Sequence, residues 1–177
     1  MGRVAKILIA AGVVAGIGFT AGQGALAERG MHPFDRELLE THNEARKQFG
    51  SKPLRWNEEL ADQAYDYAKV LAQRGRMEHS PNSARRGVGE NLWQGTERVF
   101  SGRQMVQMFV DEQRYFRPGK FPNVSSTGQW KDVGHYTQVV WPWTEEVGCA
   151  VAGNGRDDFL VCRYRPTGNI VGWPVGQ

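Results

Sequence analysis

The spacing of apolar residues predicts two long amphipathic helices in the first half of the chain. Between residues 34 and 49 apolar side chains recur every three or four positions and Gly50 follows, which is typical of a helix with one buried face. His42 lies on that face, where we expect a core histidine bonded to neighbouring backbone rather than a ligand. A second helix is expected to begin after Asn57, a favourable N-cap, and to end before Gly75.

A third helix is expected from Ser101, with a carboxylate on its apolar face. The residues that this helix would bury are Met105, Met108, Phe109 and Phe116. Glu112 follows Phe109 by three positions and therefore shares the buried face. A carboxylate removed from water needs a partner, so we expect one of the histidines to lie beside it.

The stretch from Gly75 to Gly102 predicts loops, because glycine, proline and asparagine interrupt every regular pattern in it. His79 and Glu90 fall in this stretch. Loops often carry functional side chains, although a loop histidine is more often simply exposed to solvent.

After a connection rich in glycine and aromatic residues, the pattern changes to one of β-strands. The strands are expected at about 136–141, 147–152 and 159–165. His135 would then stand at a loop-to-strand junction, at the rim of the core. Helices followed by strands, without alternating βαβ units, predict an α+β fold with an antiparallel sheet.

The first 27 residues have the features of a secretory signal peptide. Basic residues precede an apolar stretch from Ile7 to Phe19, and Ala25-Leu26-Ala27 fits the small-residue pattern at which such peptides are cleaved. Cleavage would leave one domain over residues 28–177, secreted or periplasmic. A retained membrane anchor is the alternative, but the apolar run is shorter than the ~20 residues that span a bilayer. No second apolar run follows it.

Two cysteines, Cys149 and Cys162, are expected to form a disulfide, because an exported protein matures in an oxidising compartment. Each lies in a β-type run, and Gly153-Asn154-Gly155 between them favours a turn, so the bridge would join the strands of a hairpin. Thiolate metal ligands or a cysteine nucleophile are the less favoured alternative.

Charge argues against a nucleic-acid partner. The formal charge of +3 falls to +1 once Arg3 and Lys6 of the leader are set aside, and Arg85-Arg86 is only a pair. With 40% hydrophobic residues, the chain can bury a substantial core of its own.

The candidate chemistry lies in two histidines and two glutamates, which we expect to converge on one cleft. They are His79, Glu90, Glu112 and His135. Neutral imidazoles are good zinc ligands, and two of them with a carboxylate would leave room for a water, as in metal-assisted hydrolysis with Glu90 and Glu112 as the reacting carboxylates. Neither an HExxH helix nor a GxSxG elbow is present, however, so a non-enzymatic binding module is favoured over a peptidase-like hydrolase.

Several motifs in order resemble one family. GHYTQVVWPWT (134–144) and FLVCRYRPTGNI (159–170) resemble the two characteristic motifs of the CAP superfamily (SCP domain), which groups cysteine-rich secretory, antigen 5 and plant pathogenesis-related group-one proteins. The shorter motifs HNEAR (42–46), HS (79–80) and GENL (89–92) resemble that family as well. The resemblance covers residues 35–174, nearly all of the expected mature chain.

The resemblance implies a three-layer α-β-α sandwich with a central antiparallel sheet and a central cleft. It assigns His79 and His135 to a divalent cation, often zinc and here weakly held, and Glu90 and Glu112 to the cleft. Phe109 departs from the pattern, because the family commonly has tryptophan there.

The resemblance also implies a lipid ligand. Family members bind sterols, fatty acids or other lipids, and an aromatic pocket could serve this role. The residues that could line such a pocket are Tyr115, Phe116, Phe121 and Trp130. The alternative is a cell-envelope partner, a peptide or a glycan, with Trp93 or Trp143 as stacking surfaces.

Overall fold

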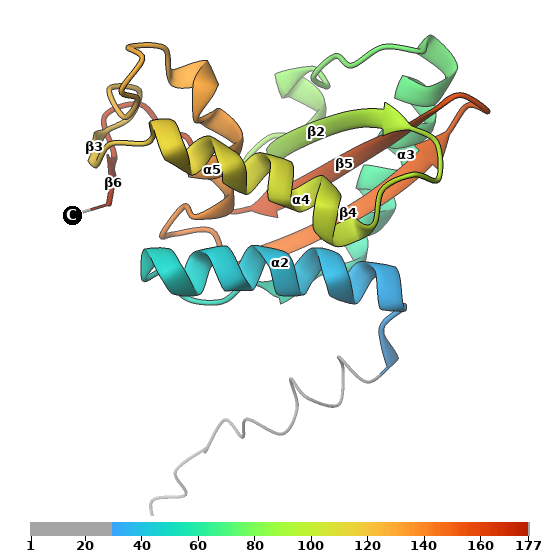
Figure 1. The fold of residues 1–177 in the computed structure, drawn as a ribbon, viewed down its shortest axis with the longest axis horizontal. Helices are drawn as coiled ribbons and strands as arrows, with labels where there is room; N and C mark the ends of the chain where they lie inside the picture. The colour runs from blue at the N-terminus through green and yellow to red at the C-terminus, as the bar shows by residue number, and fades with distance from the viewer. Residues whose placement is uncertain (1–29, 177) are drawn as a thin grey trace, which may run out of the picture. The chain divides into compact units, whose positions relative to one another are not determined.

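A four-stranded sheet organises the part of the chain that the computed structural model describes, residues 30–176 (Figure 1). Its strands, in spatial order, are β1 (Arg55–Trp56), β4 (Glu146–Gly153), β5 (Asp157–Arg165) and β2 (Gly89–Thr96). β1 runs parallel to β4, and the other neighbours are antiparallel. The expected signal peptide lies outside the described residues. Within residues 30–176, every helix is too short or too polar to cross a bilayer.

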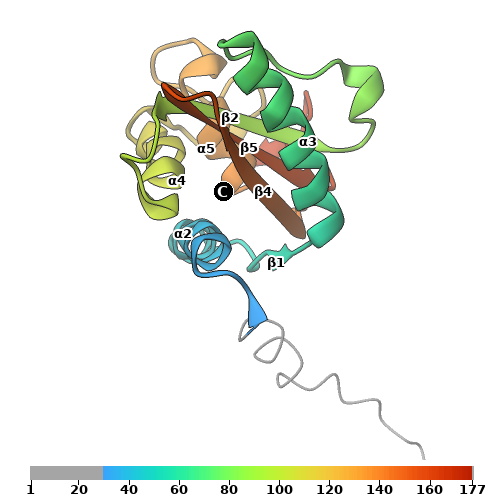
Figure 2. The ribbon, with the colours of Figure 1, turned by 90° about the vertical axis from the view of Figure 1, so that its right-hand side faces the viewer.

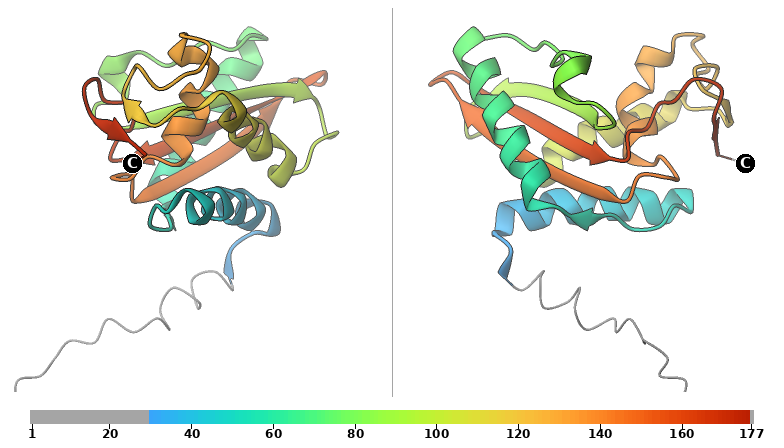
Figure 3. Two further views of the ribbon diagram at one scale, coloured as in Figure 1. Left: turned by 60° about the vertical axis from the view of Figure 1, so that its left-hand side comes forward. Right: turned by 180° about the vertical axis from the view of Figure 1, so that it is seen from behind.

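Helices cover both faces of this sheet. α3 (Glu58–Arg74) packs on β4 and β5 from one side, while α2 (Pro33–Phe49), α4 (Gly102–Val110) and the short α5 (Gly134–Val139) lie on the other. Figure 2 shows the sheet between α3 and the other helices, and Figure 3 gives the view from each side. This arrangement confirms the predicted α+β sandwich, with a mixed sheet whose longest strands are antiparallel.

α2 and α3 begin and end where the sequence predicts, and α4 begins at the predicted cap, because local capping fixes these ends. The third helix ends earlier than predicted, at Val110, and residues 111–115 form a 3₁₀ helix. The Asn57 side chain accepts a hydrogen bond from the backbone of the first turn of α3, and Ser101 forms a reciprocal capping box with Gln104. Gly50 and Gly75 end α2 and α3 with φ angles of 90° and 62°, in the left-handed region that favours glycine.

Gly148 allows α3 to approach the sheet closely. A Cβ atom at this position of β4 would overlap the backbone of α3 around Ala61. Alanines dominate the facing side of the helix, where Ala64 and Ala68 are fully buried. Small residues on both elements therefore bring helix and strand together, and any side chain at Gly148 would push them apart.

Two further predictions of secondary structure are wrong, and both concern the site. The strand expected at 136–141 is the helix α5, and Glu90 lies in the strand β2 rather than in a loop. β2 is recognisable only from its partner, because Gly89 to Thr96 pair with Tyr164 to Asp157 of β5. Helix α5 contains β-branched residues, but its tertiary contacts outweigh their weak helix propensity.

Two side chains differ in exposure from the prediction. Met108 was expected to be buried and is 42% exposed, whereas Trp93, expected as an exposed stacking surface, is only 6% exposed. Met108 projects from the edge of α4, where its sulfur accepts a hydrogen bond from the Trp93 indole (2.9 Å). Trp93 also packs edge-on against Phe100. Trp143, by contrast, is exposed as expected.

The connection between α4 and α5 contains three short elements, η2 (Asp111–Tyr115), β3 (Gly119–Lys120) and η3 (Trp130–Asp132). β3 pairs with β6 (Pro174–Val175), which ties this connection to the end of the described chain. This region contains a small core of its own, formed by the buried residues Phe121, Val124, Val133, Trp141 and Val175. A further turn, η1 (Asn82–Ala84), precedes β2.

Candidate metal-binding cleft

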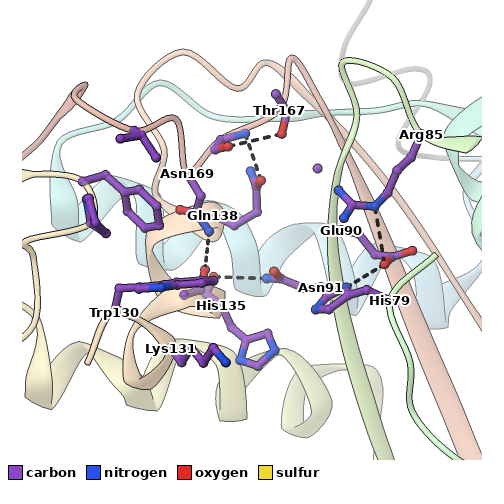
Figure 4. A pocket seen from close by; sticks show the side chains of 16 residues that line it. His79, Arg85, Glu90, Asn91, Trp130, Lys131, His135, Gln138, Thr167 and Asn169 are labelled. Carbon is purple, nitrogen blue, oxygen red and sulfur yellow. Dashed lines mark hydrogen bonds and ion pairs between the residues drawn. The ribbon is translucent and has the colours of Figure 1, made fainter. Parts of the chain in front are cut away.

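A cleft of about 740 Å³ opens at one end of the sheet, between β2, the loop before it, η3, α5 and residues 167–171. His79 and His135 both line it, from the loop before β2 and from the first turn of α5. Figure 4 shows the two imidazole rings on facing sides of this space. Two residues 56 positions apart in the sequence are thus brought to one site.

Glu90 holds the ring of His79 from behind. Its Oε1 accepts a hydrogen bond from His79 Nδ1 (2.6 Å) and another from the Ser80 backbone (3.0 Å). Its Oε2 accepts from the Ser80 hydroxyl (2.9 Å) and lies 3.1 Å from Nη2 of Arg163. The Glu90 side chain has no exposed surface, so both of its oxygens are engaged by protein donors.

Burial alone would raise the pKa of Glu90. The hydrogen bond from His79, the nearby charge of Arg163 and the two hydrogen bonds from Ser80 outweigh it, so the pKa lies below its ordinary value and the carboxylate is ionised at neutral pH. Burial in turn lowers the pKa of Arg163, against the effect of Glu90.

Glu112 holds His135 in a similar way, but with a different source of positive charge. Its Oε1 accepts from His135 Nδ1 (2.6 Å), while its Oε2 accepts the backbone N–H groups of His135 (2.9 Å) and Tyr136 (3.1 Å). Glu112 therefore supplies the acceptor for the free N–H groups at the start of α5, which carries His135. This bond also accounts for a helix that begins without a side-chain cap of its own.

Phe109 packs flat on the other side of His135. The two ring centroids lie 5.0 Å apart with an interplanar angle of 20°. Phe109 itself is only 2% exposed. The departure from the family pattern at this position therefore still places an aromatic ring against the histidine.

Within residues 30–176, the two pairs leave Nε2 of each histidine without a hydrogen-bond partner. A carboxylate accepts a hydrogen bond from the Nδ1–H group, so in the neutral ring Nε2 carries no proton. A carboxylate behind each imidazole is the usual environment of a metal-binding histidine. The donor set fits a cation held by two nitrogens with water in the remaining positions. Glu112 does not line the cleft itself, and Glu90 lines it with its oxygens turned to His79, Ser80 and Arg163.

A second group of metal-competent atoms lies in the core and is not a metal site. Among residues 30–176, His42, Cys149 and Cys162 place one such atom each close together. The two cysteines form the predicted disulfide between β4 and β5. His42 is the predicted core histidine, because Nδ1 donates to the Leu38 carbonyl (2.7 Å) and Nε2 accepts from the Tyr164 hydroxyl (2.8 Å).

A chain of hydrogen bonds connects this core to the cleft. The Tyr164 hydroxyl accepts from the Asn91 amide (3.2 Å), which also donates to the backbone carbonyl of His135 (3.1 Å). Burial lowers the pKa of His42 to about 4 and raises the pKa of Tyr164, so both stay neutral and their roles as donor and acceptor are fixed. Asn91 was not predicted as a site residue, although it is adjacent to Glu90 in β2.

Arg46 stabilises the C-terminal end of α5 and the residues that follow it. This fully buried guanidinium donates to backbone carbonyls at 2.6–3.0 Å, and among residues 30–176 no carboxylate pairs with it. The carbonyls belong to Lys52, Val139, Trp141 and Thr144. Burial lowers the pKa of Arg46 to about 10, which leaves it charged at neutral pH. A cation at the carbonyl end of α5 and a carboxylate at its N-terminus both match the helix dipole.

Arg46 and Arg163 could not be identified as site residues from the sequence. Arg163 stands between Cys162 and Tyr164 in a β-run, where a charged residue in a buried strand is the only local sign of a partner. Arg46 lies in the HNEAR motif, but its hydrogen-bond acceptors are all backbone carbonyls, so no pattern of side chains in the sequence indicates them.

Comparisons with known proteins agree on one family. The sequence model of the cysteine-rich secretory protein (CAP) family matches residues 39–164 of this chain. Pathogenesis-related protein 1B of Nicotiana tabacum is 36% identical over 138 residues, which are 77% of each chain. Golgi-associated plant pathogenesis-related protein 1 of Homo sapiens is 34% identical over 141 residues, 78% of this chain and 86% of that protein.

Solved structures share the fold as well. The crystal structure of NaASP2 with Zn²⁺ has a TM-score of 0.70 and 25% sequence identity, and the match covers 84% of this chain and 87% of that one. The venom allergen-like protein 4 of Schistosoma mansoni matches with a TM-score of 0.60 at 22% identity, over 83% of this chain and 97% of that one.

Proposed function

Because the chain belongs to the cysteine-rich secretory protein (CAP) family, we propose that it is a secreted or periplasmic, non-enzymatic binding protein. Its cleft would hold a divalent cation, zinc in the first instance, through Nε2 of His79 and of His135. An apolar or lipid ligand, such as a sterol or a fatty acid, would bind beside the cation.

The observation that carries the cation proposal is the matched pair of hydrogen bonds behind the histidines. In each pair a carboxylate oxygen lies 2.6 Å from Nδ1, which fixes the ring and leaves Nε2 without a hydrogen-bond partner among residues 30–176. The NaASP2 crystal structure contains Zn²⁺, in agreement with this proposal. Since only two nitrogens are on offer, we expect moderate affinity, below that of structural zinc sites with four protein ligands.

The engagement of the carboxylates supports a binding role rather than hydrolysis. A general base needs a free carboxylate oxygen within reach of the reacting water. Both oxygens of Glu90 accept bonds from the protein, and Glu112 is bonded to His135 and Tyr136. The Ser80 hydroxyl donates to Glu90 and accepts from Arg163, so it is not poised as a nucleophile either.

The apolar part of the cleft supports a lipid ligand. Its apolar lining residues are Phe121, Pro122, Trp130 and Val171. Of the aromatic residues expected there, Phe121 and Trp130 take part, whereas Tyr115 and Phe116 lie outside the lining. Secretion is supported by the leader-like residues 1–27 and by the secretory character named in the family description.

The cation proposal is tested by calorimetric titration of the metal-stripped protein with zinc. We expect binding of about one equivalent that is abolished in the double variant His79→Ala/His135→Ala. The control is His32→Ala, which removes an exposed histidine outside the cleft lining. Because ligand imidazoles must be neutral, the affinity should fall steeply below about pH 6.

Two outcomes would contradict the proposal. Zinc binding that survives in the double variant would place the ion elsewhere, and no binding by the parent protein would remove the cation from the function. A lipid-displacement assay tests the second part: saturable, stoichiometric displacement is expected, and its absence across sterols and fatty acids would turn attention to cell-envelope peptides or glycans.

A further inference from the structure

Asn91 is a buried amide in the wall of the cleft, and both of its N–H groups are used inside the protein. The residue is only 2% exposed, yet it lines the cleft from β2, between His135 and His79 (Figure 4). Its Nδ2 donates to the backbone carbonyl of His135 (3.1 Å) and to the Tyr164 hydroxyl (3.2 Å). A carbonyl oxygen can only accept, so these partners fix which way the amide is turned.

The oxygen of the same amide has no donor. Within residues 30–176, Oδ1 of Asn91 accepts no hydrogen bond, although the nitrogen beside it makes two. The side chain is therefore held in place by its N–H groups and presents an unused acceptor at the wall of a cleft. Such an oxygen can accept a hydrogen bond from water or from a ligand donor that enters.

The comparable oxygens of the lining are already occupied. Oε1 of Gln138 accepts a hydrogen bond from a backbone N–H group (2.9 Å), and Oδ1 of Asn169 accepts one from a threonine hydroxyl (2.7 Å). Both oxygens of Glu90 accept bonds from the protein. Of the side-chain amide and carboxylate oxygens that line the cleft in the described part of the chain, Asn91 Oδ1 is thus the one without a donor.

A cation held by two imidazoles needs such an acceptor. The positions that protein nitrogens leave open on the ion are filled by water, whose oxygen faces the ion. The hydrogens of this water point away from the ion and require acceptors. The charged side chains Arg85 and Lys131 also line the cleft, but they carry donors only and cannot serve.

We propose that Asn91 is a further residue of the cation site, and that its Oδ1 accepts a hydrogen bond from water bound to the cation. The inference rests on the proposed function and adds a residue that acts through this water. The same side chain joins the site to the core, because Nδ2 is bonded to Tyr164, whose hydroxyl donates to His42. Asn91 therefore contacts the water with one end of its amide and steadies the first turn of α5 with the other.

The test is calorimetric titration with zinc of the metal-stripped parent and of two variants that separate the oxygen from the nitrogen. Asn91→Leu removes both, and the zinc affinity should fall by about tenfold or more, as is typical when a group that supports a metal site is removed. Asn91→Asp keeps an acceptor of the same shape and loses the N–H donors. Its affinity should be at least that of the parent, because a charged acceptor binds the water more strongly.

A matched control comes from the same strand. Gln94 also carries a side-chain amide in β2, but it bonds Asp157 and does not line the cleft. Gln94→Leu should therefore leave the zinc affinity unchanged.

A second measurement uses the parent protein alone, so it does not depend on how well the variants fold. On saturation with zinc, the ¹³C resonance of the Asn91 side-chain carbonyl should move downfield, because a hydrogen bond to the oxygen polarises the C=O group. The side-chain carbonyls of Gln138 and Asn169 line the same cleft with their oxygens already bonded, and should move much less.

Three results would overturn the inference and leave the cation proposal standing. Equal weakening in Asn91→Leu and Asn91→Asp would show that the amide acts only through its N–H groups. Zinc affinity that is unchanged in Asn91→Leu would show that the oxygen is not used, and so would an unmoved Asn91 carbonyl resonance in the zinc-saturated parent. Failure of the parent to bind zinc would overturn both the inference and the cation proposal.

Discussion

His42 should make the stability of this protein depend on pH between about 4 and 6.5. The imidazole is fully buried and neutral, donates from Nδ1 to the Leu38 carbonyl and accepts at Nε2 from Tyr164. Burial lowers its pKa to about 4, from the 6.5 of an exposed histidine. In this pH window the unfolded chain binds a proton that the folded chain does not, so unfolding becomes easier as the pH falls.

The magnitude follows from the size of the shift. Each unit of pKa difference is worth about 1.4 kcal/mol, so the free energy of unfolding should fall by about 3 kcal/mol from pH 7 to pH 4 through this residue alone. The loss is small above pH 6.5, steepest between pH 6 and 4.5, and complete below pH 4. It is a large fraction of the 5–15 kcal/mol that stabilises typical domains.

The measurement is urea unfolding followed by tryptophan fluorescence at several pH values, with the disulfide intact. His42→Gln keeps an acceptor for Tyr164 but cannot be protonated. It should be less stable than the parent at pH 7, and the difference should shrink by about 3 kcal/mol toward pH 4. His32→Gln, which removes the exposed histidine that caps α2, should change the free energy of unfolding by about 1 kcal/mol at most and show the same pH dependence as the parent.

Other groups also titrate in this range, and the comparison of variants cancels their effect. Glu90, for example, has a lowered pKa and loses its stabilising contribution as the pH falls through that value, in the parent and in both variants alike. A stability difference between parent and His42→Gln that stays constant from pH 7 to pH 4 would refute the reasoning.

Three further predictions concern the groups around the cleft and the sheet. Arg46→Met should lower the free energy of unfolding by at least about 3 kcal/mol in a urea titration, because buried carbonyls lose their donor; a loss below 1 kcal/mol would contradict this. Arg163→Met should weaken zinc binding by about tenfold in calorimetry, because the carboxylate that holds one histidine ligand loses its ion pair. Arg165→Met, on the same strand but paired with a solvent-exposed glutamate, should leave zinc affinity unchanged. Equal effects of the two variants would show that Arg163 has no such role. Reduction of the Cys149–Cys162 disulfide should cost about 3 kcal/mol by the same unfolding assay, and an unchanged midpoint would show that the hairpin does not depend on it.

The helices were predictable because their information is local. In α2 and α3 the apolar spacing, the N-cap and the terminal glycine lie within one continuous segment and agree with one another. The β4–β5 hairpin was predictable for the same reason, since turn residues lie between two β-type runs and the cysteines bring the strands together.

The site depends on contacts that no local pattern contains. Helix α5 begins where Glu112, from a different element, accepts its N-terminal N–H groups, so propensity alone indicated a strand. β2 contains polar residues such as Glu90 and Asn91 at buried positions, and their partners lie on β5 and α5. The chemistry of His79 and His135 could be inferred from residue types, while the pairing of each with a particular glutamate required the fold.

The contacts of Arg46 have a consequence for how the folded protein opens. Through this side chain, α2 is bonded to backbone carbonyls of residues 139–144, which are 93–98 positions later in the sequence. Neither segment can detach without stranding a charge in the core, so amide protons in the second half of α2 and in α5 should exchange with solvent together, as one cooperative unit. The side of the cleft formed by α5, which carries His135, should therefore open as slowly as the core and not as fast as a surface loop.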